Sequence, residues 1–94
     1  NADIGRNKAK NIEQLKEHRA HYINKMLPLI RRFQEDEQKI IICSNSMQAT
    51  SRYLKEGHPV KFIVELKRYM SQWEPRCGYL TIFRVALMKL GRRI

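Results

Sequence analysis

The chain has 94 residues, of which 19 are Lys or Arg and 9 are Asp or Glu, so its net charge at pH 7 is +10. Hydrophobic residues make up 43% of the chain, which is too many for a disordered tail, and no apolar stretch approaches the roughly 18 residues of a membrane span. We therefore expect one small folded domain without membrane insertion, whose partner is a nucleic acid or an anionic membrane surface.

The first third of the chain has the pattern of a basic arm followed by a long helix. Residues 1–10 are polar and basic with little periodicity, which favours an extended N-terminal arm. Asn11 can cap a helix, and apolar residues then recur at three- and four-residue steps, so residues 11–34 are predicted to form one amphipathic helix. Pro28 is expected to kink this helix because proline lacks a backbone donor and crowds the preceding turn.

An acidic run, Glu35-Asp36-Glu37, comes next. Carboxylates are unfavourable at the C-terminal end of a helix, so we expect a loop here. Residues 40–43 are apolar but too few to classify, and both a brief strand and a buried connector fit them. Ser and Asn residues can cap a second helix over residues 47–56, which Gly57 would close.

The C-terminal third is predicted to hold a third helix and a strand. Pro59 suits the first turn of a helix over residues 59–73. Residues 79–88 are rich in aromatic and β-branched side chains, which predicts a strand covered on both faces. Gly78, just before it, is expected at a tight turn or a close backbone approach, where a Cβ would clash.

Together these elements predict an α+β fold: a mainly helical small domain with three helices packed on a short strand or small sheet. Residues 1–10 would be a basic N-terminal arm, and residues 11–94 a single domain. The inner faces of the elements are expected to bring together Leu27, Ile30, Ile63, Leu66, Met70 and Phe83.

The residues do not indicate an enzyme. The sequence has no Gly-rich phosphate loop, no serine elbow and no His–Cys pair with a positioned acid. Cys43 and Cys77 are expected to be reduced and buried. His18 and His21 have no cysteine near them, so solvated histidines are favoured over a metal site. We expect no catalytic residue, no cofactor, no metal and no small-molecule substrate.

Three blocks of sequence resemble the L-seventeen family of bacterial-type large-subunit ribosomal proteins, including its organellar members. The first is HYINKML over residues 21–27, the second is RYLKE followed by VKFIVEL over residues 52–66, and the third is RY followed by CGYLTIF over residues 68–83. The family has P-R-Y and G-G-Y in the third block, where this chain has Lys67 for the proline and Cys77 for the first glycine. The family's basic N-terminal segment and last strand have no counterpart.

The resemblance implies a structural constituent of the ribosomal large subunit that binds and stabilises rRNA through a basic surface and contacts neighbouring large-subunit proteins. Mitochondrial ribosomes are the expected location, with the bacterial cytoplasm or a plastid as alternatives. The resemblance marks Arg68, Tyr69, Arg76 and Tyr79 as RNA-binding candidates. Charge adds Lys8, Lys10, Arg19, Arg31, Arg32, Arg84, Arg92 and Arg93.

Two alternatives remain at this point. The chain could be a basic helical subunit of another RNA- or DNA-binding complex, although the predicted third helix has few polar side chains for base edges. The helix over residues 11–33 could rest on an anionic membrane, but Glu13, Glu17 and the acidic run oppose that arrangement.

Overall fold

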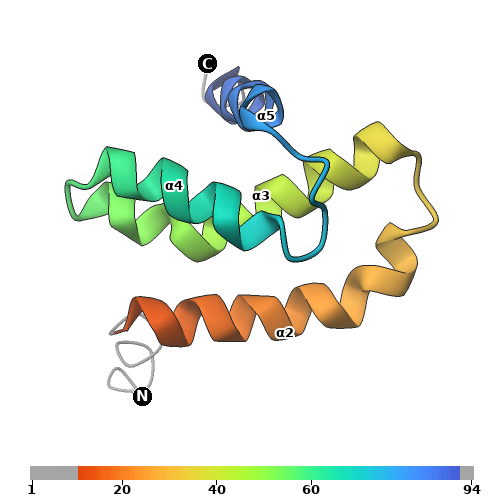
Figure 1. The fold of residues 1–94 in the computed structure, drawn as a ribbon, viewed down its shortest axis with the longest axis horizontal. Helices are drawn as coiled ribbons and strands as arrows, with labels where there is room; N and C mark the ends of the chain where they lie inside the picture. The colour runs from red at the N-terminus through yellow and green to blue at the C-terminus, as the bar shows by residue number, and fades with distance from the viewer. Residues whose placement is uncertain (1–10, 92–94) are drawn as a thin grey trace.

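Residues 11–91, the part of the chain that the computed structural model describes, form four α-helices. These are α2 (Ile12–Ile30), α3 (Glu35–Lys55), α4 (Pro59–Met70) and α5 (Tyr79–Gly91) (Figure 1). This part of the chain contains no strand, so the fold is a small compact all-α domain. The predicted α+β class is therefore wrong, and the reasons lie in residues 35–43 and 79–88.

The central element is α3, which contacts each of the other three helices. It forms an antiparallel hairpin with α4, while α2 runs along the hairpin and α5 crosses it, seen nearly end-on in Figure 1. Because it is covered from several sides, α3 buries apolar and small polar side chains around much of its surface: Ile42, Cys43, Ser46, Met47, Ala49, Thr50 and Tyr53.

The acidic run forms the first turn of α3, and the loop predicted there is wrong. Glu35, Asp36 and Glu37 lie at the N-terminal end of this helix, where carboxylates interact favourably with the helix dipole. Residues 40–43 continue the same helix, which resolves the choice between strand and connector. The polar residues expected to cap a new helix lie inside α3, where Asn45 Nδ2 donates to the Ile41 carbonyl at 2.9 Å.

Both expected ends of the α3–α4 turn are confirmed. Gly57 closes α3 with φ at +86°, a conformation that favours glycine, and the His58 N–H donates to the Tyr53 carbonyl at 2.9 Å. Pro59 is the first residue of α4. In α2, the Asn11 side chain accepts from the Glu13 N–H at 2.8 Å, as its capping position predicts, and the helix continues through Pro28.

The strand predicted over residues 79–88 is wrong because these residues form α5. Ile82 and Val85 are buried at a three-residue spacing, so the segment buries one helical face rather than two strand faces. β-branched composition favours a strand only where a neighbouring strand can pair with it, and residues 11–91 provide none. Gly78 precedes α5, and a Cβ there would meet nothing within 4 Å, so within residues 11–91 no close backbone approach requires this glycine.

The core contains most of the expected side chains. Ile30, Leu66 and Met70 are buried, and Leu27 and Ile63 pack against the core while partly exposed. Phe83 is 52% exposed, so its predicted place in the core is wrong. It follows Ile82 by one residue, which turns it about 100° away from the buried face of the helix. The core also includes Ile23, Ile42, Tyr69, Trp73 and Cys77.

Replacing Leu66 by Ala is expected to lower the free energy of unfolding by about 2–5 kcal/mol, because it removes a side chain that is 0% exposed and leaves a cavity. Val64→Ala is the matched control, since Val64 lies on the same helix and is 55% exposed. Urea unfolding of the three proteins measures both effects. A decrease at Leu66 no larger than the decrease at Val64 would contradict this packing.

Candidate nucleic-acid interface

Two lysines from different helices lie over one buried aromatic ring. Tyr53 of α3 is 5% exposed, and its ring centroid is 5.8 Å from Lys16 Nζ of α2 and 5.3 Å from Lys61 Nζ of α4. Both distances are within the range of cation–π attraction. The ring therefore brings one ammonium group from α2 and one from α4 to the end of the molecule where the α3–α4 hairpin turns.

Lys16 is also attracted to Glu65 of α4, with Nζ and Oε2 3.9 Å apart. The same carboxylate oxygen lies 3.7 Å from Arg68 Nη1, and it accepts no hydrogen bond from residues 11–91. Both contacts are too long for hydrogen bonds, so Glu65 attracts the two cations without using up their donors. Arg68 leaves most of its side chain in solvent.

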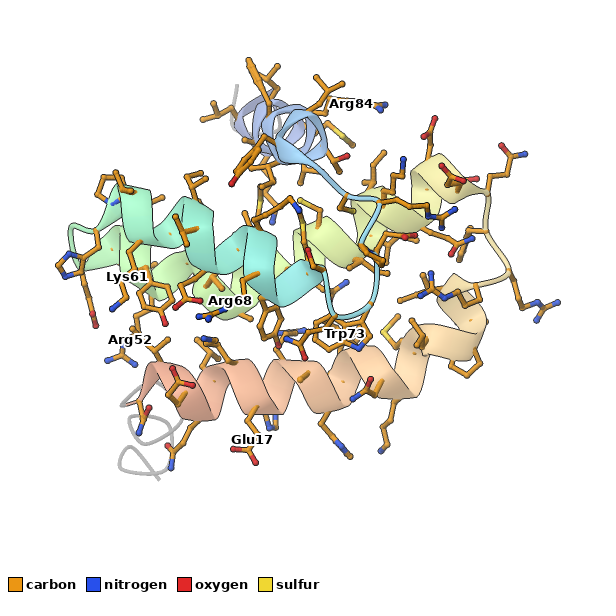
Figure 2. The ribbon with its side chains drawn as sticks, viewed as in Figure 1. Glu17, Arg52, Lys61, Arg68, Trp73 and Arg84 are labelled. Carbon is orange, nitrogen blue, oxygen red and sulfur yellow. The ribbon has the colours of Figure 1, made fainter. Side chains whose placement is uncertain are left out.

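Arg52 of α3 adds a second guanidinium group to this end of the molecule. Its Nε donates to Glu56 Oε2 at 3.2 Å, while its Nη1 is buried and donates to no residue between 11 and 91. We call Lys16, Arg52, Lys61 and Arg68 the basic seam. Figure 2 shows three of them, Arg52, Lys61 and Arg68, on the side of the α3–α4 hairpin that faces the N-terminal half of α2.

Two hydrogen bonds tie α2 to α4 and to the turn that follows α4. The Tyr69 hydroxyl donates to the Lys16 carbonyl, and Trp73 Nε1 donates to Asn24 Oδ1 at 2.8 Å. The Tyr69 and Trp73 rings meet edge to face with centroids 5.0 Å apart. Both rings are buried, and burial raises the pKa of Tyr69 to about 12. Tyr69, a candidate RNA contact, therefore sits in the core.

The other candidates from the sequence lie apart from one another. Arg19 of α2 stacks over the half-exposed ring of Tyr22, with its guanidinium carbon 5.1 Å from the ring centroid. Arg32 is exposed after the end of α2, and Tyr79 and Arg84 are exposed on α5 (Figure 2 labels Arg84). Lys8, Lys10, Arg92 and Arg93 lie outside the described residues.

Arg31 and Arg76 meet at a carboxylate inside the fold. Arg76 donates to Glu74 through Nε at 2.8 Å and Nη2 at 2.6 Å, and a second interaction joins its Nη1 to Glu35. Arg31 donates to the Trp73 carbonyl, and its Nη1 lies 3.5 Å from Glu74. Glu74 is 2% exposed. These contacts join the α4–α5 connection to the end of α2 and the start of α3.

The pKa of Glu74 is lowered from the ordinary value of 4.5. The hydrogen bonds from the Arg76 side chain are the largest cause, and the charges of Arg76 and Arg31 act in the same direction, while burial opposes them. Glu74 is therefore held as a carboxylate. Arg31 and Arg76 stabilise the fold by neutralising it.

Sequence reasoning missed three of the four side chains in the basic seam: Lys16, Arg52 and Lys61. The sequence does place Arg52 beside Tyr53, and basic residues next to an aromatic one are a usable signal. Only the packing of α2 and α4 on α3 shows that Lys16 and Lys61 reach the same ring.

The remaining reactive side chains do not assemble a further site in the described part of the chain. Cys43 and Cys77 are buried free thiols, and burial raises their pKa to about 12 and about 11, which leaves them protonated and unreactive. No three His, Cys, Asp or Glu side chains between residues 11 and 91 are placed to hold a metal ion.

His18 and His21 line a shallow hollow on the exposed face of α2. None of the helices α2–α5 is long and apolar enough to cross a membrane.

Compared with known proteins, the chain matches no protein-family model, no curated protein sequence and no solved structure.

Replacing Glu74 by Gln is expected to lower the free energy of unfolding by about 1–3 kcal/mol at neutral pH, because two arginines would no longer share a buried carboxylate. The lowered pKa also gives a pH signature. The stability that Glu74 contributes is present above its unfolded pKa, and is lost as the pH falls through 4.5 towards the lower folded value.

Urea unfolding from about pH 7 to about pH 2 tests both points. The Glu74→Gln variant should lose less stability on acidification than the parent, so the two curves converge at low pH. Glu17→Gln is the control, because Glu17 is exposed on α2 and forms no ion pair within residues 11–91. Parallel curves for the parent and Glu74→Gln would contradict the assigned role.

Proposed function

We propose that this protein is a non-catalytic RNA-binding module that holds RNA phosphates on the basic seam. The observation that carries the proposal is that cations from two helices, Lys16 of α2 and Lys61 of α4, lie over the ring of Tyr53 of α3. Phosphates bind guanidinium and ammonium groups through charge-assisted hydrogen bonds, and Arg adds a planar fork that grips two oxygens. Arg68 offers an exposed guanidinium for this purpose, and Arg52 adds the charge of a guanidinium whose Nη1 is buried.

The wider charge distribution supports a polyanion rather than a small anion. Outside the basic seam, further Lys and Arg side chains form no ion pair with an acidic side chain within the described residues: Arg19, Lys25, Arg32, Lys55, Lys67, Arg84 and Lys89. They are spread over all four helices and the α2–α3 connection, so an extended backbone of phosphates would meet several of them at once. Arg19 over Tyr22 supplies an exposed pair on which an unpaired base could stack.

We propose the ribosomal large subunit, in mitochondria, as the assembly in which this RNA is rRNA. The support is the resemblance of residues 21–27 and 52–66 to the L-seventeen family, and the second of these blocks supplies Arg52, Tyr53, Lys61 and Glu65. The third block gives less support, because Tyr79 begins α5 where a strand was predicted.

A second candidate is a basic helical subunit of another RNA- or DNA-binding complex. The all-α fold favours it, since helical modules are common among such subunits and the strand predicted over residues 79–88 is replaced by α5. Co-sedimentation separates the two candidates. A ribosomal protein travels with the large subunit through a sucrose gradient, whereas a subunit of another complex travels away from it.

RNA binding is expected to weaken with salt, because each neutralised phosphate releases counterions. A Lys61→Gln, Arg68→Gln double variant should lower the slope of log affinity against log salt by roughly 0.7 for each phosphate of a single-stranded RNA that is no longer neutralised. Fluorescence anisotropy with a labelled single-stranded RNA at several salt concentrations measures the slope. The thermal unfolding midpoint of the variant should stay close to that of the parent, because both side chains lie on the surface.

A Lys25→Gln, Arg32→Gln double variant is the matched control for this experiment, because it also removes one lysine and one arginine, and Arg32 is exposed after the end of α2. Lys25 is exposed on α2, half a turn around the helix from Lys16, and is therefore turned away from the basic seam. If the two double variants lower the slope equally, binding is a property of the total charge and the proposed site is wrong. No measurable binding by the parent would reject RNA as the partner.

A further inference from the structure

We propose that a second copy of this chain docks on the exposed face of α5 to form a two-fold symmetric dimer. This face carries an apolar stripe, defined as Tyr79, Leu80, Phe83, Leu87 and Leu90, whose members are 52–75% exposed. The opposite face of α5 holds Ile82 and Val85, which are buried in the core. The fold of residues 11–91 therefore uses one face of α5 and leaves the other uncovered.

The apolar stripe has the shape of a helix-packing surface. At 100° per residue its five members fall within an arc of about 100°, and from Tyr79 to Leu90 they extend for about 16 Å along the axis. The stripe contains no charged side chain, and α5 contains no acidic residue at all. A continuous apolar face of this width is the pattern that a helix presents to another element of structure.

The exposed area of the stripe meets what a symmetric dimer needs. Five large apolar side chains that are half exposed or more present on the order of 500 Å², near the upper end for the largest patch on a monomer. When two stripes cover each other they bury about 1,000 Å² in total, which is the least that a specific interface requires.

The order of residues along the stripe is suited to pairing with itself. In an antiparallel arrangement, a two-fold axis near Val85 sets Phe83 against the partner's Leu87 and Leu80 against the partner's Leu90, with Tyr79 one residue further along beside the same Leu90. Each aromatic ring then meets a leucine, and every contact occurs twice, as a two-fold interface requires. The helix dipoles of the two α5 helices also oppose each other, which is favourable for neighbours.

The dependence of association on salt distinguishes a second copy of the chain from other partners that could cover the apolar stripe. Arg84 lies at the edge of the stripe near its middle, on the outer side of α5 (Figure 2), so the two-fold axis brings both Arg84 side chains to the same edge. Each copy also carries a net charge of +10. Salt screens both repulsions, so the dimer should tighten as salt rises, whereas an acidic helix on this face would be released by salt.

Sedimentation equilibrium of the full chain, without RNA, tests the dimer from about 0.1 M to about 1 M salt, over which the screening length falls from about 10 Å to about 3 Å. The dimer fraction should increase across this range. Leu87→Gln should weaken self-association by about tenfold or more, because it places an amide at the centre of the interface. Leu29→Gln, a change of equal exposure (54% against 55%) on α2, should leave it unchanged.

Arg84→Gln provides the complementary variant. It should increase the dimer fraction at low salt and flatten the dependence on salt, since it removes the closest pair of like charges. A chain that stays monomeric at every salt concentration, or a dimer that Leu87→Gln does not weaken, overturns the proposal. Binding to anionic vesicles that Leu87→Gln abolishes, by a chain that is monomeric in solution, would also overturn it and assign the stripe to a membrane surface.

Discussion

The burial of α3 is the constraint on which the rest of the structure depends. Every other helix packs against it, and its buried residues form the centre of the core. Because α3 occupies the interior, most charged side chains lie on the outer faces of α2, α4 and α5 or at the places where these helices meet. Tyr53 lies on α3 at one such place, so the packing that buries its ring also brings Lys16 and Lys61 to it.

The basic side chains within residues 11–91 fall into two groups, one that stabilises the fold and one that forms the basic seam. Arg31 and Arg76 neutralise Glu74 and hold the α4–α5 connection in place, which fixes where α5 begins. The basic seam instead consists of four cations whose charge is only partly compensated, by Glu13, Glu65 and Glu56. Like charges that are only partly compensated in this way are stabilised by a polyanion.

The sequence correctly predicted the helix ends that carry a local signal, such as a capping residue. Its predictions were wrong where packing against other helices determines the secondary structure. Asn11, Gly57 and Pro59 act through their own backbone or side chain, and their positions are confirmed. The acidic run was expected to form a loop after the first helix, although the helix dipole also favours carboxylates at the start of the next helix, where the structure has them. Residues 79–88 have the composition of a strand, but their buried residues also have the spacing of a helix. The helix forms because residues 11–91 contain no strand with which a strand could pair. The basic seam could not be foreseen, because Lys16 and Lys61 lie far apart in the sequence and meet only through α3.

The central claim is that RNA phosphates bind where Lys16, Arg52, Lys61 and Arg68 converge. The most direct test is a titration of the isotopically labelled protein with single-stranded RNA, followed residue by residue in two-dimensional NMR spectra. Our account predicts that the side-chain signals of Arg52 and Arg68 and the backbone signals around Lys16 and Lys61 shift together and saturate with one affinity. Shifts confined to Arg31 and Arg76, or to the apolar stripe of α5, with no change at the basic seam, would contradict it.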